Sequence, residues 1–138
     1  MANEQNQKKA QQKYVELQMF DNQLKQIQKQ VQTLENQAVE VEMILESLEE
    51  IKKVDKNSEL LVPIANGIFA KAKMIDSENL IVNVGSGTAV TKKVDNTKDM
   101  LTSQVIEIRA AQEHLSIQFN SILERARQVE VEMQELVK

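Results

Sequence analysis

Apolar residues in the first part of the chain recur at alternating steps of three and four positions, which is the spacing of a heptad repeat. A continuous apolar seam of this kind is typical of a coiled-coil helix. The flanks are rich in Gln and then in Glu. A Gln-rich stretch could be disordered, but sustained heptads favour a solvated helix face. The pattern predicts a helix over residues 5–54, with the seam Leu17, Phe20, Leu24, Ile27, Val31, Leu34, Ala38, Val41, Leu45 and Leu48.

A second heptad pattern occupies the last third of the chain and predicts a helix over residues 97–138. We expect Asp95, Asn96 and Thr97 to cap its start. Gln112 is the single polar residue of the seam, and a lone polar seam residue typically sets the register of two helices. The seam residues are Leu101, Val105, Ile108, Gln112, Leu115, Phe119, Ile122, Ala126, Val129, Met133 and Leu136.

The two seams can pair if the chain folds back on itself between them. Antiparallel pairing places Leu48 near Leu101 and Leu17 near Glu132, with both chain ends at the far end of the pair. Roughly 40 residues at about 1.5 Å per residue give an arm about 60 Å long. The predicted fold class is therefore mainly α, an antiparallel two-helix coiled coil with a central insert, in a single domain over residues 1–138.

The central insert, residues 58–94, has a different pattern. It holds the only proline, Pro63, and all three glycines of the chain. Short alternating runs predict strands over residues 60–64, 68–74, 80–84 and 88–93. Asn66-Gly67, a polar turn at residues 76–79, and Gly85-Ser86-Gly87 separate these strands. The insert is expected to form two β-hairpins.

Two isolated hairpins are marginally stable in water, and no further amphipathic segment remains to cover them. We therefore expect other subunits to complete this region; the alternative is a sheet that packs against its own helices. The apolar residues expected to assemble the complex are Leu60, Val62, Ile64, Ile68, Phe69, Leu80, Ile81, Val82, Val84 and Val90.

The far end of the predicted arm carries apolar side chains beyond the seam, such as Tyr14, Met19, Val131 and Val137. Flexible, partly exposed apolar groups of this kind bind many sequences weakly. Scattered exposed apolar residues without a function are the alternative. The residues expected to form this binding surface at the tip are Tyr14, Leu17, Met19, Phe20, Val129, Val131, Met133, Leu136 and Val137.

The composition of the chain argues against several classes of partner and site. The net charge of −4 argues against nucleic acid as the main partner, since phosphate binding needs clustered Lys and Arg. The absence of cysteine excludes disulfides and thiolate metal sites, and is consistent with a reducing cytosol. We see neither an apolar signal-peptide core nor an apolar run long enough to cross a membrane. We therefore expect a cytoplasmic protein.

The sequence offers no convincing catalytic or metal-binding constellation. His114 is the only histidine and lies beside Glu113 without a metal-ligand spacing. Gly85-Ser86-Gly87 lacks the residues that follow in phosphate-binding loops and is interpreted as a hairpin turn. We expect no enzyme, no metal and no cofactor. A helical-bundle metalloenzyme is a remaining alternative, and elemental analysis would test it.

The layout of helix, four strands and helix resembles the α class of prefoldin over essentially the whole chain. Three segments carry the resemblance, namely Leu-Val-Pro-Ile at 61–64, Gly67-Ile68-Phe69, and Val84-Gly85-Ser86-Gly87 before the second helix. Because it has two hairpins rather than one, the chain resembles the α class and not the β class.

This resemblance implies a heterohexamer of two α and four β subunits, whose hairpins join an inter-subunit β-barrel. It further implies an ATP-independent chaperone that captures non-native proteins at the coiled-coil tips and delivers them to a group II chaperonin. A structural coiled-coil scaffold or spacer oligomer without client binding is the alternative. Suppression of client aggregation distinguishes the two.

Overall fold

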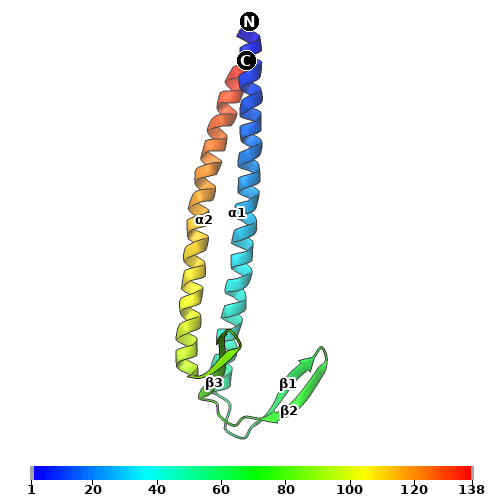
Figure 1. Ribbon diagram of the computed structural model, residues 1–138, viewed down its shortest axis with the longest axis vertical. Helices are drawn as coiled ribbons and strands as arrows, with labels where there is room; N and C mark the ends of the chain where they lie inside the picture. The colour runs from blue at the N-terminus through cyan, green and yellow to red at the C-terminus, as the bar shows by residue number, and fades with distance from the viewer. Residues whose placement is uncertain (1, 138) are drawn as a thin grey trace. The chain divides into compact units, whose positions relative to one another are not determined.

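The computed structural model describes residues 2–137 and consists of two long helices separated by four strands (Figure 1). Contacts divide the chain into a terminal unit, residues up to 37 and from 108 onward, and a central unit, residues 38–107. The predicted fold class of two helices around two hairpins is confirmed. The elements are α1 (Ala2–Lys52), β1 (Glu59–Ala65), β2 (Ile68–Lys73), β3 (Asn79–Gly85), β4 (Thr88–Lys93) and α2 (Val94–Val137).

Burial along both helices follows the predicted heptads. Every seam residue predicted above is buried or half-buried, whereas most positions between them are exposed. Ala38 is fully buried, and Ile27 and Val129 are exposed by less than a tenth of their surface. Because long polar helices gain most of their stability from packing, this narrow stripe is what holds them in helical form.

The core of the central unit lies where α1 ends and α2 begins. Leu48, Val94 and Leu101 form its buried cluster, so the predicted proximity of Leu48 and Leu101 is confirmed. Val94 is the most deeply buried of the three, with 2% of its surface exposed. The half-buried residues packed against the cluster are Val41, Leu45, Ile51, Leu80 and Met100.

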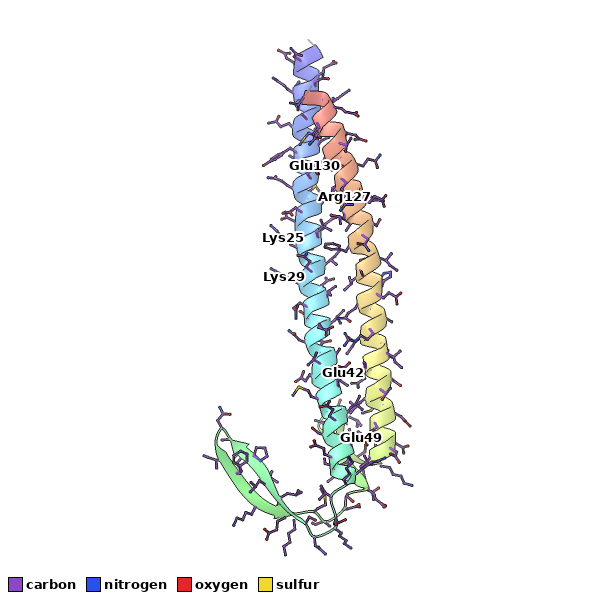
Figure 2. The ribbon with its side chains drawn as sticks, turned by 180° about the vertical axis from the view of Figure 1, so that it is seen from behind. Lys25, Lys29, Glu42, Glu49, Arg127 and Glu130 are labelled. Carbon is purple, nitrogen blue, oxygen red and sulfur yellow. The ribbon has the colours of Figure 1, made fainter. Side chains whose placement is uncertain are left out.

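Two ion pairs join the same helix ends. Lys98 pairs with Glu49, which is labelled in Figure 2, and Lys52 pairs with Asp95. Lys52 lies in the last turn of α1 and Asp95 in the first turn of α2, so each charge also has the favourable sign for its helix end. Both pairs are partly solvated and contribute little to stability by themselves, but they are compatible with only one register.

The predicted start of α2 is wrong. Asp95, Asn96 and Thr97 do not cap the helix from outside, because α2 begins at Val94, directly after β4. The backbone N–H of Val94 donates to the Glu78 carbonyl oxygen at 2.9 Å. Thr97 lies within the first turn, where its hydroxyl donates to the Lys93 carbonyl oxygen at 3.0 Å. The turn before β3 thus accepts one of the N–H groups at the helix start, which a capping side chain would otherwise satisfy.

The α1 helix also differs slightly from its predicted bounds, since it begins at Ala2 and ends at Lys52. Lys53 and Val54 donate to the carbonyl oxygens of Glu50 and Ile51 at 3.1 Å, in tight final turns. Asn57 then takes a φ of 70° and leads the chain away from the helix. Helix ends commonly tighten in this way, so differences of a few residues are expected.

The four strands form two separate antiparallel hairpins, β1 with β2 and β3 with β4. Val62 pairs with Ala70 in the first hairpin, and Val82 pairs with Val90 in the second. In both, a seven-residue strand precedes a six-residue strand and the register shifts just before the turn. The second hairpin therefore repeats the design of the first.

The turns lie where the glycines predict them. Gly67 takes a φ of 77° and Gly87 a φ of 71°, a region that costs a side-chain-bearing residue about 1–2 kcal/mol. The polar turn between the hairpins is held by Asp76, whose carboxylate accepts hydrogen bonds from the backbone N–H groups of Glu78 and Asn79. These local bonds fix the direction in which β3 leaves the turn.

The terminal unit contains a polar cluster around Gln112. Its side-chain amide donates to the Glu35 carboxylate at 3.0 Å and to the Val31 carbonyl oxygen at 3.3 Å. Arg109 donates to the same carboxylate and to Gln112 Oε1. Sliding one helix along the other would break these bonds together, which supports the register-setting role predicted for Gln112. Hydrogen bonds from Gln112, and then from Arg109, lower the pKa of Glu35.

Leu101→Ala tests the central core. Leu101 is 8% exposed, so its truncation should lower the free energy of unfolding by about 2–4 kcal/mol through lost burial and a cavity. Urea unfolding followed by circular dichroism measures this change. Ile106→Ala is the matched control, because Ile106 is 64% exposed on the same helix and its truncation should change stability by less than about 0.5 kcal/mol. Equal losses in both variants would contradict the assigned core.

Gln112→Leu tests the polar cluster through pH. The pKa of Glu35 lies below its ordinary value of 4.5 in the folded chain. The stability that ionised Glu35 contributes is therefore present above pH 4.5 and is lost as the pH falls through the folded pKa. Without the Gln112 amide the pKa should return toward 4.5, and the loss of stability in acid should become shallower. Urea midpoints on either side of pH 4.5 measure this slope. Gln118→Leu, on the same helix and in contact with His114, should keep the original slope.

Candidate protein-interaction surfaces

The ends of the two helices in the terminal unit enclose an open groove of about 530 Å³, which we call the tip groove. A volume of this size is large enough for several side chains of a bound peptide. Its lining residues lie on the parts of α1 and α2 that lead to the two chain ends, which Figure 1 shows close together, as the fold-back predicts. Its lining residues are Tyr14, Leu17, Gln18, Asp21, Asn22, Glu130 and Met133.

Helical spacing explains why these residues share one surface. Tyr14, Leu17 and Asp21 are separated by three and four positions on α1, and Glu130 and Met133 by three positions on α2. Leu17 and Met133 are half-buried seam residues, whereas Tyr14 lies outside the seam and is 55% exposed. The groove is therefore a continuation of the apolar seam that the two helices leave open. The predicted neighbourhood of Leu17 and Glu132 is confirmed to within about one helical turn.

Two ion pairs involve residues of the groove or their neighbours in the sequence. Lys13 pairs with Glu132, and the hydrogen bond between them raises the pKa of Lys13. Lys25 pairs with Asp21 at 3.0 Å along α1, with both side chains more than half exposed. Figure 2 shows Lys25 and Lys29 extending from α1 on the side away from α2. The pair of Lys13 with Glu132 holds the helix ends in register, and the apolar floor stays open to solvent.

The predicted client-contact residues fall into three groups by exposure. Tyr14, Met19, Val131 and Val137 are exposed, with fractions from 55% to 74%. Leu17, Phe20, Met133 and Leu136 are half-buried in the seam, and Val129 is buried. The groove brings together only Tyr14, Leu17 and Met133 of this set. Their role in client contact stays a prediction.

Sequence reasoning did not include the polar groove residues Gln18, Asp21, Asn22 and Glu130 among the candidates, nor the exposed Val15. An apolar pattern gives no signal for polar residues that line a groove. Val15 was detectable, because it is an apolar residue on the outer face of the predicted helix and is 52% exposed. A search for off-seam apolar positions finds it next to Tyr14.

The hairpins form a second candidate surface. Of the predicted assembly residues, Leu60, Val82 and Val90 are half-buried, and six are exposed: Val62, Ile64, Ile68, Phe69, Ile81 and Val84. Ile81, the most exposed of them, has 81% of its surface open to solvent. Leu61 and Ile75 are also exposed, by 66% and 80%, and were not among the predicted residues. Contiguous exposure of large apolar side chains marks a surface that binds a partner.

Leu80 differs from the other predicted assembly residues, because it packs against the cluster of Leu48, Val94 and Leu101. The second hairpin is therefore partly covered by its own helices, which was the alternative interpretation for the insert. In the first hairpin, five large apolar residues are exposed: Leu61, Val62, Ile64, Ile68 and Phe69. The role of Leu80 in assembly stays a prediction.

The described residues do not assemble a metal centre. No group of three or more His, Cys, Asp and Glu side chains among residues 2–137 is arranged to hold a metal ion. His114 lies on the helix surface, where its ring nitrogen is 3.3 Å from the Gln118 side-chain nitrogen. Within the same residues, neither helix is long and apolar enough to span a membrane.

Two helices paired through heptad seams, with an open groove at one end and exposed hairpins in the central unit, define a class of coiled-coil assembly subunits. The Prefoldin subunit family profile matches residues 20–138. The chain belongs to the prefoldin family, which is a family of chaperones, as the resemblance implied.

Curated relatives are named as α subunits. The chain is 25% identical over 126 residues to prefoldin subunit alpha of Archaeoglobus fulgidus, covering 91% of this chain and 92% of that relative. It is 34% identical over 104 residues to prefoldin subunit alpha of Pyrococcus horikoshii, covering 75% of this chain and 70% of that relative. These matches support the predicted similarity to the α class.

A solved structure shares the fold. The cryo-EM structure of filamentous PFD from Methanocaldococcus jannaschii aligns with a TM-score of 0.75, covering 83% of this chain and 95% of that chain. The sequence identity is 12%, so the alignment reports the fold alone. The helix, two-hairpin and helix order is thus the prefoldin fold.

Proposed function

We propose that this chain captures non-native proteins at the ends of its helices, as the α subunit of an ATP-independent chaperone. The observation that supports this best is the tip groove, where Tyr14, Leu17 and Met133 present apolar surface to solvent. The exposed Met19, Val131 and Val137 extend the apolar surface of the helix ends. Non-native chains expose apolar segments of varied sequence, and flexible apolar surfaces can adapt to them.

Binding at one open groove is weak, and we propose that several arms act together. Two or more grooves that hold one client raise the overall affinity through effective concentration, without a tight individual site. Weak individual contacts also permit release without a nucleotide. This mechanism requires that the helix ends stay free while another part of the chain holds the assembly together.

The hairpins are the part proposed to hold the assembly. Each hairpin pairs its two strands and leaves the outer backbone edges available for another strand. Their exposed apolar residues are proposed to join a β-barrel in a heterohexamer of two α and four β prefoldin subunits. The family-based proposal also includes delivery of clients to a group II chaperonin and a cytoplasmic location, with no cofactor, no nucleic acid and no membrane as partners.

A scaffold or spacer oligomer without client binding is the alternative proposal. The same hairpin surface serves it equally well, and the solved structure that shares this fold belongs to a filamentous PFD. The two proposals differ in the tip groove, which a passive spacer does not use. Mass measurement with and without a β-type partner identifies the assembly, and client aggregation identifies the function.

Serine substitution at the tip tests client capture. The triple variant Tyr14→Ser, Met19→Ser and Val131→Ser removes apolar surface that is at least 55% exposed, so the fold should remain stable. Suppression of client aggregation by the assembled complex should fall at least about fivefold, as weakened contacts multiply across the arms. Light scattering of a thermally unfolded client measures this activity.

The control carries serine at Val39, Met43 and Ile106, which are exposed by 43%, 62% and 64% in the central unit. It should protect clients as well as the unmodified complex. Deletion of residues 1–20 and 129–138 should abolish protection while the oligomer stays intact. Equal protection by the tip and control variants, or by the truncated complex, would contradict the tip assignment.

Aspartate substitution in the hairpins tests assembly. Ile64 and Ile81 are exposed by 69% and 81%, so Ile64→Asp and Ile81→Asp should leave the fold of the chain unchanged. Burial of a carboxylate in a subunit interface is costly, and the complex should dissociate toward its subunits. Light-scattering mass after size exclusion measures this. Ile117→Asp, at a 62% exposed position of α2, is the control and should leave the mass of the complex unchanged. If only this control variant dissociates, the interface lies on the helices and not on the hairpins.

A further inference from the structure

Charge is distributed unevenly around the tip groove. Asp21 lines it from α1 and Glu130 from α2, whereas no Lys or Arg is among its lining residues. Gln18 and Asn22 add neutral amide groups beside the apolar floor. An apolar groove with carboxylates contributed by both helices differs in chemistry from a purely apolar one.

Neither carboxylate is committed to a strong internal partner. The only ion pair of Asp21 among the described residues is with Lys25, whose side chain is 67% exposed and extends from α1 away from α2 (Figure 2). Exposed pairs of this spacing contribute little to stability and exchange readily. Glu130, also labelled in Figure 2, makes no ion pair with another described residue.

A neighbouring groove at the same helix ends provides an internal comparison. Lys9, Lys13, Glu16, Glu132 and Glu135 line it, so cations and carboxylates occur together. Lys13 and Glu132 form a direct ion pair there. Only Leu136 supplies a large apolar side chain. Of these two grooves, only the tip groove has carboxylates and several apolar side chains but no Lys or Arg among its lining residues.

We propose that the tip groove selects client segments in which apolar side chains lie next to Lys or Arg. This inference rests on the proposed capture of clients at the helix ends and names the chemistry that they prefer. Apolar client residues contact Tyr14, Leu17 and Met133, while a cationic neighbour reaches Asp21 or Glu130. An acidic neighbour is repelled by the same carboxylates and by the net charge of −4 on the chain.

A pair of fluorescent peptides tests the inference on the full-length chain in its assembled complex. Both peptides carry leucine and valine at the same positions, with lysine between them in one and glutamate in the other. Fluorescence anisotropy should show about fivefold tighter binding of the lysine peptide, and the difference should shrink as salt is added.

Charge substitutions assign the preference to the groove. Asp21→Asn with Glu130→Gln should bring the two peptides to within about twofold of each other, and Asp21→Lys with Glu130→Lys should reverse their order. Both positions are exposed, so the unfolding midpoint should not change. Glu113→Gln, at an exposed position of α2 that does not line the groove, is the matched control and should retain the preference.

The outcomes separate this inference from the proposed function. Equal binding of both peptides by the unmodified complex overturns the charge preference but leaves client capture standing. A preference that survives both groove variants overturns the assignment to Asp21 and Glu130. Failure of both peptides to bind overturns the groove as a client site and this inference with it.

Discussion

The apolar seam shared by the two helices is the interaction on which the other features depend. The large residues that it buries most deeply, such as Ile27, Leu48, Leu101 and Val129, lie on one narrow stripe of each helix. A stripe of this width stabilises the helices but leaves the rest of their surface in water. The chain therefore has no wide core that could absorb other apolar groups. Those beyond the seam remain available for partners.

The hairpins, like the helices, have no wide core in which to bury apolar side chains. Each forms a two-stranded sheet, which by itself has little apolar surface to bury. Leu80 attaches the second hairpin to the central core, but Ile64 and Ile81 remain exposed. Membership in the prefoldin family accounts for this exposure, because a subunit of an assembly can leave its interface uncovered as a single chain. We propose that assembly and client contact use separate parts of one chain.

The sequence predicted these features to different degrees. Heptad spacing, together with a chain that folds back across the insert, was sufficient to place Leu48 near Leu101. Glycine chemistry was sufficient to place the turn at Gly67, because a turn depends on local geometry. The start of α2 was predicted wrongly, since it depends on the hydrogen bond from the Val94 N–H to the Glu78 carbonyl oxygen in the turn before β3. The groove residues Asp21 and Glu130 were missed, because a polar residue gives the same sequence signal on a free surface and beside a groove.

The sequence by itself determined the two helices, the two hairpins, the antiparallel pairing and the resemblance to the prefoldin α class. Periodicity and turn residues act over a few neighbouring positions, so these features are encoded locally. Only the tertiary structure decided which residues far apart in the sequence meet. Leu80 packs against the central core, Gln112 contacts Glu35 and Arg109, and two carboxylates line the tip groove. Such contacts join positions far apart in the chain, and their geometry depends on the exact register of the folded helices and strands.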